Sequence, residues 1–172
     1  NAVPAMAEAY FQRSPVIFIT GSSTMKRVGR GGFKEIDHNR VAEPITKYTI
    51  SVTAGERIAE AVDKAYDMAV NGNPGPVHIS IPTDLLYSSF EQGEQQGERP
   101  FKLSRREVHR PSPNPDDMRK LASIMKDAKK PVIVAGNGVW WSGAEEQLED
   151  VASQIGIPVY NAPYHHKVLD IG

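Results

Sequence analysis

Short apolar runs alternate along the chain with longer segments in which apolar residues recur at helical spacing. The runs cover residues 16–19, 77–81, 132–135 and 159–160, with proline or glycine close to each. They are continuous and rich in β-branched residues, which is typical of strands buried on both faces of a parallel sheet. A helix is also expected over residues 3–12. Strands alternating with helices predict an α/β fold with parallel sheets flanked by helices. Helices packed on an antiparallel sheet are the alternative.

Three further helices are amphipathic, and each is expected to begin at a polar cap residue. The expected caps are Thr53, Asn114 and Ser142. Glu56 and Glu145 stand three residues after Thr53 and Ser142, as in a capping box. Each helix carries an apolar stripe, and we expect the third stripe to be buried. The three stripes are Ile58, Val62, Ala65 and Ala69; Met118, Leu121, Ala122 and Met125; and Leu148, Val151, Ala152 and Ile155.

A polar segment interrupts this pattern near the middle of the chain. Residues 91–110 hold nine charged side chains and are followed by a Pro-x-Pro-x-Pro sequence. Such a composition predicts an interdomain linker, which we place at residues 91–113. The flanking segments, residues 1–90 and 114–172, are then expected to be two partial Rossmann-like domains, because neither chain end has the character of a domain edge.

Composition and charge exclude several classes of function. The formal net charge is -1, from 20 basic and 21 acidic side chains, which gives no global attraction to nucleic acid or to an anionic membrane. The absence of cysteine excludes disulfides, thiolate nucleophiles and iron–sulfur ligation. The uncharged, apolar stretch at residues 131–144 is too short to span a bilayer. We therefore expect a soluble, cytoplasmic protein with no nucleic-acid or membrane partner.

Two glycines follow the third apolar run. Gly136 and Gly138 lie between that run and a helix, where glycine lets backbone amides approach a phosphate group. Trp141 stands where the dinucleotide-binding fingerprint needs a third glycine. A tight strand-to-helix turn and a phosphate or nucleotide site both remain open interpretations.

The loop at residues 21–33 follows the first apolar run. It contains four glycines and three basic residues, and Lys34 adds a fourth cation. In an α/β sheet such a loop lies at the carboxyl ends of the strands, where ligands usually bind. Its composition suits a phosphate or a carboxylate; the alternative is a mobile loop exposed to solvent.

The histidines do not form a metal-binding pattern. His165 and His166 are adjacent, so on an extended segment they point to opposite faces and cannot readily chelate one ion. His38, beside Asp37, is either a residue of a surface helix or a base. These residues alone do not define a reaction.

One block of sequence is far more specific. Residues 72–84 read GNPGPVHISIPTD, which resembles the signature that closes the pyrimidine-binding domain of thiamine diphosphate-dependent enzymes of the acetolactate (acetohydroxyacid) synthase type. Residues 1–10, the segment PVIFITGSSTMKRVGRGGFKEID and the segment PITK resemble earlier blocks of that domain in the same order. After the polar segment, KKPVIVAGNGVWWSGA and GIPVYNAP are similar to the opening of the family's central domain.

The resemblance implies a carboligase or decarboxylase that acts on pyruvate or another 2-oxo acid. Thiamine diphosphate and Mg²⁺ are the implied cofactors, and a homodimer or homotetramer is the implied assembly. The family's catalytic glutamate and its metal site fall outside the matched blocks, so we expect no catalytic or metal-binding residue here and no activity from this chain alone. Arg13 and Asn73 replace the serine and arginine that face the flavin in flavin-bearing members, which puts FAD binding in doubt.

Three positions match functional residues of the family. Phe33 falls on the loop aromatic residue that lines the active site, and Lys34 falls on a glutamine that contacts the cofactor region. Lys47 matches a lysine near the substrate channel. The resemblance therefore implies that Lys34 binds the cofactor and that Phe33 and Lys47 bind the substrate.

Two alternatives compete with this hypothesis. Within the same family, a subclass that binds a CoA thioester would use Lys26, Arg27 and Arg30 near the phosphates. Outside it, the chain would be a non-catalytic nucleotide- or CoA-binding α/β module built on residues 136–138.

Overall fold

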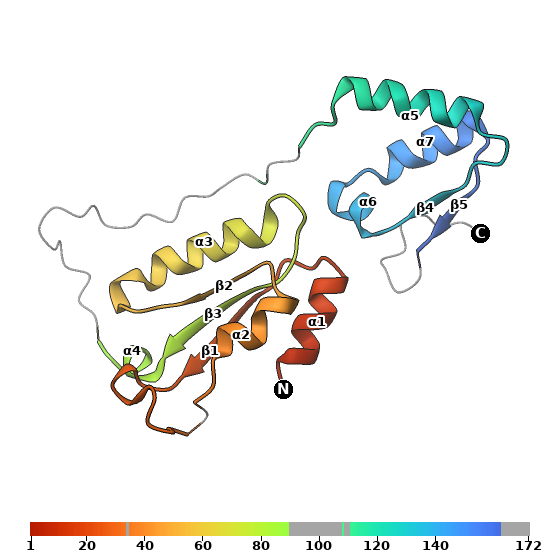
Figure 1. Cartoon of the computed structure of the whole chain (residues 1–172). Helices are drawn as coiled ribbons and strands as arrows, with labels where there is room; N and C mark the ends of the chain where they lie inside the picture. The colour runs from red at the N-terminus through yellow and green to blue at the C-terminus, as the bar shows by residue number, and fades with distance from the viewer. Residues whose placement is uncertain (34, 90–107, 109–110, 163–172) are drawn as a thin grey trace, which may run out of the picture. The chain divides into compact units, whose positions relative to one another are not determined.

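A computed structural model describes residues 1–33, 35–89, 108 and 111–162. The chain divides into two units, Asn1–His109 and Arg110–Gly172 (Figure 1). Most of the expected linker at residues 91–113 lies outside the described residues, as do Lys34, His165 and His166. Each unit is therefore described by itself.

Unit 1 is built on a three-stranded parallel sheet. Strand β3 (Val77–Pro82) lies in the centre, between β1 (Ile17–Ser22) and β2 (Tyr48–Ser51). Ile19 of β1 and Ile50 of β2 both stand in register with Ile79 of β3. All six residues of β3 are buried, as expected for a central strand, although the strand is not continuously apolar, because His78 and Ser80 alternate with its apolar residues; β1 and β2 are only partly buried. The predicted α/β fold with parallel strands is confirmed.

Helices cover both faces of this sheet. Helix α3 (Ile58–Val70) lies on one face, and α1 (Val3–Phe11) and α2 (His38–Ala42) lie on the other (Figure 1). The short helix α4 (Thr83–Leu86) follows β3 directly. The expected helix at residues 3–12 is thus present.

The two faces of the sheet differ in chemistry because side chains alternate along each strand. Ile79 and its neighbours of odd number pack against the alanines of α3. The core cluster on this face contains Val52, Ala61, Ala65, Ala69, Val77, Ile79, Ile81 and Leu85. The even-numbered residues of β3 include His78 and Ser80, which are 1% and 2% exposed on the face covered by α2. The central strand therefore separates an apolar layer from a polar one.

The predicted cap of α3 is wrong. A 3₁₀ turn at Gly55–Arg57 precedes the helix, and Arg57, the N-cap residue, makes no side-chain capping bond. This extra turn moves the helix start past Thr53. The 3₁₀ turns Met25–Arg27 and Glu43–Ile45 complete the described elements of unit 1.

Unit 2 contains three helices and a parallel pair of strands in its described residues. These elements are α5 (Pro115–Asp127), β4 (Ile133–Ala135), α6 (Asn137–Ser142), α7 (Glu145–Ile155) and β5 (Val159–Asn161). The cap at Asn114 is confirmed, because its side chain accepts a hydrogen bond from the Asp116 amide at 2.8 Å.

The predicted cap at Ser142 is wrong. Ser142 ends the short helix α6, and Gly143 follows it in the left-handed conformation (φ 60°) that commonly ends helices. Helix α7 then begins at Glu145 without a side-chain cap. The sequence pattern missed α6 because its six residues are too few to show a helical period.

The apolar stripes of unit 2 are less buried than expected. Leu121 of α5 is 47% exposed, and Val151 and Ile155 of α7 are 45% and 51% exposed. Within the described residues these helices accompany a sheet of only two short strands, which is too small to cover their apolar faces. No helix in the described part of the chain is long and apolar enough to cross a membrane.

Candidate functional site

The loop between β1 and α2 starts where β1 ends, at the carboxyl edge of the sheet of unit 1. Ligands of open α/β sheets usually bind at this edge. Two residues next to β3 hold the start of the loop: Thr83 Oγ1 donates to the Ser22 carbonyl at 2.6 Å, and the Asp84 carboxylate accepts from the Met25 amide at 3.3 Å. The loop is therefore anchored to the central strand.

The middle of the same loop is organised by Glu35. Its carboxylate accepts hydrogen bonds from the amides of Gly29 and Gly32. These two bonds, that of Gly29 first, lower the pKa of Glu35 below its ordinary value, because they stabilise the charged form. Sequence reasoning missed Glu35 and Asp84, although a carboxylate three residues after paired glycines is a usable signal.

Phe33 stands on this loop and is 88% exposed. The Ser23 hydroxyl donates to the Phe33 carbonyl at 3.4 Å, which brings the two sides of the loop together. Lys34, the next residue, lies outside the described residues. The position of Phe33 at the carboxyl edge is compatible with the expected role in substrate binding, which stays a prediction.

Lys47 lies at the opposite, amino edge of the sheet, directly before β2. Its ammonium group donates to the carbonyls of Met68 and Asn71, at 2.5 Å and 2.8 Å, at the end of α3. The pKa of Lys47 is lowered, first by burial and then by the charge of Arg13. A six-residue parallel strand spans about 20 Å, so Lys47 and Phe33 do not share one pocket within this unit.

Replacing Lys47 with methionine should lower the free energy of unfolding of unit 1 by about 1–2 kcal/mol. The reason is that the variant leaves two carbonyls at the end of α3 without their charged donor, while the aliphatic stem is kept. Urea unfolding followed by circular dichroism measures this change. Lys120→Met on exposed α5 is the matched control and should be nearly neutral; equal losses in both variants would contradict the structural role of Lys47.

A buried histidine links the three strands on the polar face of the sheet. His78 Nε2 lies 2.8 Å from Thr20 Oγ1 of β1, and Nδ1 lies 2.8 Å from Thr49 Oγ1 of β2. Thr49 donates to Asn39 of α2, and Asn39 donates to Ser51 at 2.9 Å. Burial, followed by the nearby charge of His38, lowers the pKa of His78. His78 is therefore a neutral structural link at neutral pH.

Of the two glycines of unit 2, only Gly136 lies between β4 and α6, as the N-cap of the helix, whereas Gly138 is the second residue of α6. A Cβ added at Gly138 would meet nothing within 4 Å. Packing therefore does not require glycine at 138. Trp140 and Trp141 stack edge to face with ring centroids 4.4 Å apart, in agreement with a packing role.

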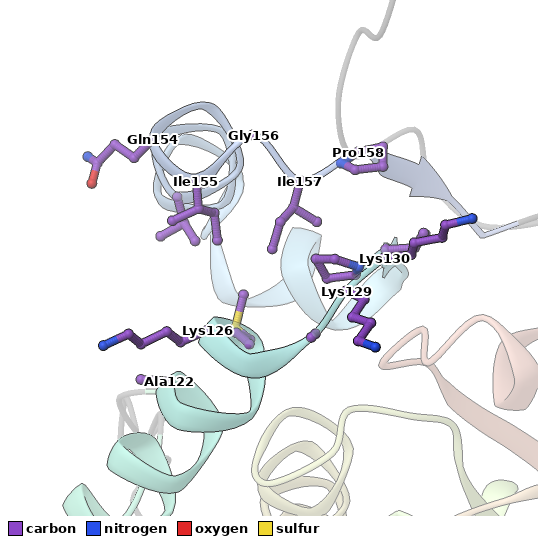
Figure 2. A pocket seen from close by; sticks show the side chains of 14 residues that line it. Ala122, Lys126, Lys129, Lys130, Gln154, Ile155, Gly156, Ile157 and Pro158 are labelled. Atoms are coloured by element: carbon purple, nitrogen blue, oxygen red, sulfur yellow. The ribbon is translucent and has the colours of Figure 1, made fainter.

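Unit 2 also contains an apolar groove of about 910 Å³ between the ends of α5 and α7. Met125, Ile155 and Ile157 contribute its apolar lining, and three lysines stand at the rim. Figure 2 shows that the ammonium groups of Lys126, Lys129 and Lys130 point outward and away from one another. The lysines therefore do not converge on one anionic group in the groove.

Comparison with known proteins identifies the family. Residues 118–171 match the family described as thiamine pyrophosphate enzyme, central domain. The chain is 37% identical over 164 residues to a probable acetolactate synthase large subunit of Methanocaldococcus jannaschii, a match that covers 92% of this chain and 27% of the relative. The chain belongs to the thiamine pyrophosphate enzymes. An acetolactate synthase of Mycobacterium leprae is 35% identical over 161 residues and is likewise matched by 92% of this chain, which covers 25% of that protein.

A solved structure shares the fold of this chain. Benzoylformate decarboxylase from Polynucleobacter necessarius superposes with a TM-score of 0.79 at 23% identity, over 95% of this chain and 29% of the other. The chain spans about a quarter of the length of the curated relatives it matches. The family resemblance expected from residues 72–84 and the other blocks is confirmed.

No group of three or more His, Asp or Glu side chains in the described part of the chain is arranged to hold a metal ion. The carboxyl-edge loop instead offers backbone amides, exposed Phe33 and a run of cations. These features suit contacts to an anionic or conjugated ligand more than metal coordination.

Proposed function

We propose that the chain is part of an acetolactate synthase-like enzyme that decarboxylates pyruvate or another 2-oxo acid and transfers the remaining carbon unit to an acceptor. The observation that carries this proposal is the similarity to acetolactate synthases over 92% of the chain, which extends through both units. Thiamine diphosphate supplies the carbanion chemistry in such a transferase or lyase, and the protein binds and orients it. We also propose Mg²⁺ as the ion that accompanies its diphosphate.

Within this chain, the loop at the carboxyl edge of β1 is the proposed contribution to the active site. Phe33 would contact the substrate there, and Lys34 would contact the cofactor. Lys47 would border the substrate channel from the amino edge of the sheet. Because the two edges are about 20 Å apart, Phe33 and Lys47 of one protomer would contact different regions of the active site and its substrate channel. A homodimer or homotetramer, in a cytoplasmic setting, is the proposed assembly.

Assays of the full-length protein test this function directly. With thiamine diphosphate and Mg²⁺ present, we expect release of CO₂ from pyruvate or another member of a 2-oxo acid panel, together with a condensed product such as acetolactate. The 172-residue chain alone is the control, and calorimetry should detect no binding of thiamine diphosphate to it. A full-length protein that binds both cofactors yet decarboxylates no 2-oxo acid would overturn the proposal.

A further inference from the structure

The loop between β1 and α2 holds a carboxylate in a cradle of its own backbone amides. Glu35 Oε1 accepts from the Gly29 amide, and Oε2 accepts from the Gly32 amide at 2.7 Å. The Gly31 amide, which lies between them, also favours the charged form of Glu35, whereas the Arg30 amide donates to the Arg27 carbonyl at 3.1 Å. The amides of Gly29 and Gly32 thus hold the two oxygens of one carboxylate.

The backbone of residues 29–32 is shaped for this arrangement. Gly29 and Gly31 have φ values of 82° and 69°, which side chains disfavour and which let successive N–H groups converge. A Cβ added at either residue would meet no atom within 4 Å, so glycine is needed there for conformation and not for space. Such concave groups of amides, known as nests, bind anions in many phosphate sites.

The charges around the nest favour anions as well. Lys26, Arg27 and Arg30 are exposed on the same loop, and residues 22–33 contain no acidic side chain. Of the two acidic residues that follow, Asp37 caps α2 by accepting a hydrogen bond from the Arg40 amide at 3.1 Å. Glu35 is therefore the loop carboxylate that fills the nest, in a segment with three cations.

We propose that the amides of Gly29 and Gly32 form an oxyanion-binding site that Glu35 occupies from within the chain, and that a carboxylate or phosphate group of a ligand can take its place. The site is open to such exchange because Gly29, Arg30 and Gly31 are exposed and Glu35 is only partly buried. Exchange would release Glu35 and shift Phe33, two residues earlier, at the edge where ligands of such sheets bind. This site depends on the loop alone and not on thiamine diphosphate chemistry.

Nuclear magnetic resonance of the 172-residue chain tests the proposal. Glu35→Ala empties the nest, and formate and inorganic phosphate are titrated in turn at constant ionic strength, so that general screening does not change. We expect saturable shifts of the Gly29 and Gly32 amide signals, with a dissociation constant at least tenfold below that of the wild-type chain. The anion that binds with the higher affinity shows whether the site prefers a carboxylate or a phosphate ligand.

Glu43→Ala is the matched control, because it removes the same charge from an exposed residue outside the nest. The proposal is overturned when neither anion produces saturable shifts in Glu35→Ala, or when Glu43→Ala gains as much affinity. The amide signals of β3 report whether each variant is folded. If Glu35→Ala loses these signals, Glu35→Gln is used in its place, because its single acceptor oxygen leaves half of the nest open. An anion affinity at least threefold above that of the wild-type chain supports the site, and an unchanged affinity refutes it.

Discussion

Replacing Ile79 with alanine is expected to lower the free energy of unfolding of unit 1 by about 3–4 kcal/mol. Ile79 lies in the centre of β3 and is fully buried between its neighbours in register and the alanines of α3. Small residues such as Ala65 bring the helix backbone close to the sheet, so neighbouring side chains have little freedom to fill the cavity. Urea unfolding at constant pH measures the change.

Ile19→Ala is the matched control for this variant. Ile19 stands in register with Ile79 on the adjacent strand and is the same residue type, but it is 56% exposed. The control should therefore lose about 1 kcal/mol or less. Similar losses at both positions would show that the apolar layer between β3 and α3 is not the main core of unit 1.

The second large effect is expected at His78. His78→Ala should destabilise unit 1 by about 3 kcal/mol at pH 7.5, because it opens a cavity and leaves the hydroxyls of Thr20 and Thr49 without their shared partner. The wild-type chain should also lose stability as the pH is lowered from 7.5 to 5.5. Guanidinium unfolding at a series of pH values measures both effects.

The sign of the pH effect follows from the lowered pKa of His78 in the folded state. The unfolded chain keeps the ordinary value near 6.5, so below that pH it binds more protons at this position than the folded chain. Stability from neutral His78 is therefore complete above about pH 6.5 and falls as the pH decreases toward the lower, folded value. The charge of His38 on α2 also acts on His78.

Two variants separate the histidines. His78→Gln removes the titrating group but keeps a polar side chain, and it should flatten the stability profile between pH 5.5 and 7.5. His38→Gln is the control and should retain most of the slope, because His78 is the buried link between the strands. An unchanged slope in His78→Gln, or its loss in His38→Gln, would assign the pH dependence to another group.

The strongest sequence signals were those of fully buried or locally capped elements. Strand β3 was predicted because its apolar run is bounded by Pro76 and Pro82, and α5 because Asn114 and Pro115 define its start within one turn. Strand β2 was missed because YTIS is short and only partly buried, so tertiary pairing with β3 decides its state. Local pattern cannot show such pairing.

The candidate site was predictable in its location but not in its contacts. The glycines and cations of residues 21–33 indicated a ligand loop at the carboxyl edge, where the structure has it. The resemblance implies a substrate role for both Phe33 and Lys47, which stays a prediction, and it did not show that Lys47 binds carbonyls at the end of α3. The contacts of His78 could not be inferred from the sequence, since they depend on how distant strands meet, whereas the glycines before Glu35 were a usable signal that the sequence analysis did not use.

The alternation of apolar and polar side chains along β3 favours a single alignment of the strands when unit 1 folds. Sliding β3 by a single residue would exchange its two faces and bring His78 and Ser80 into the alanine-lined layer beside α3, without partners. A uniformly aliphatic strand would tolerate such a misaligned state at little cost. The imidazole of His78 therefore raises the free energy of misaligned sheets, in addition to stabilising the native state, and so helps the chain to reach a single strand register.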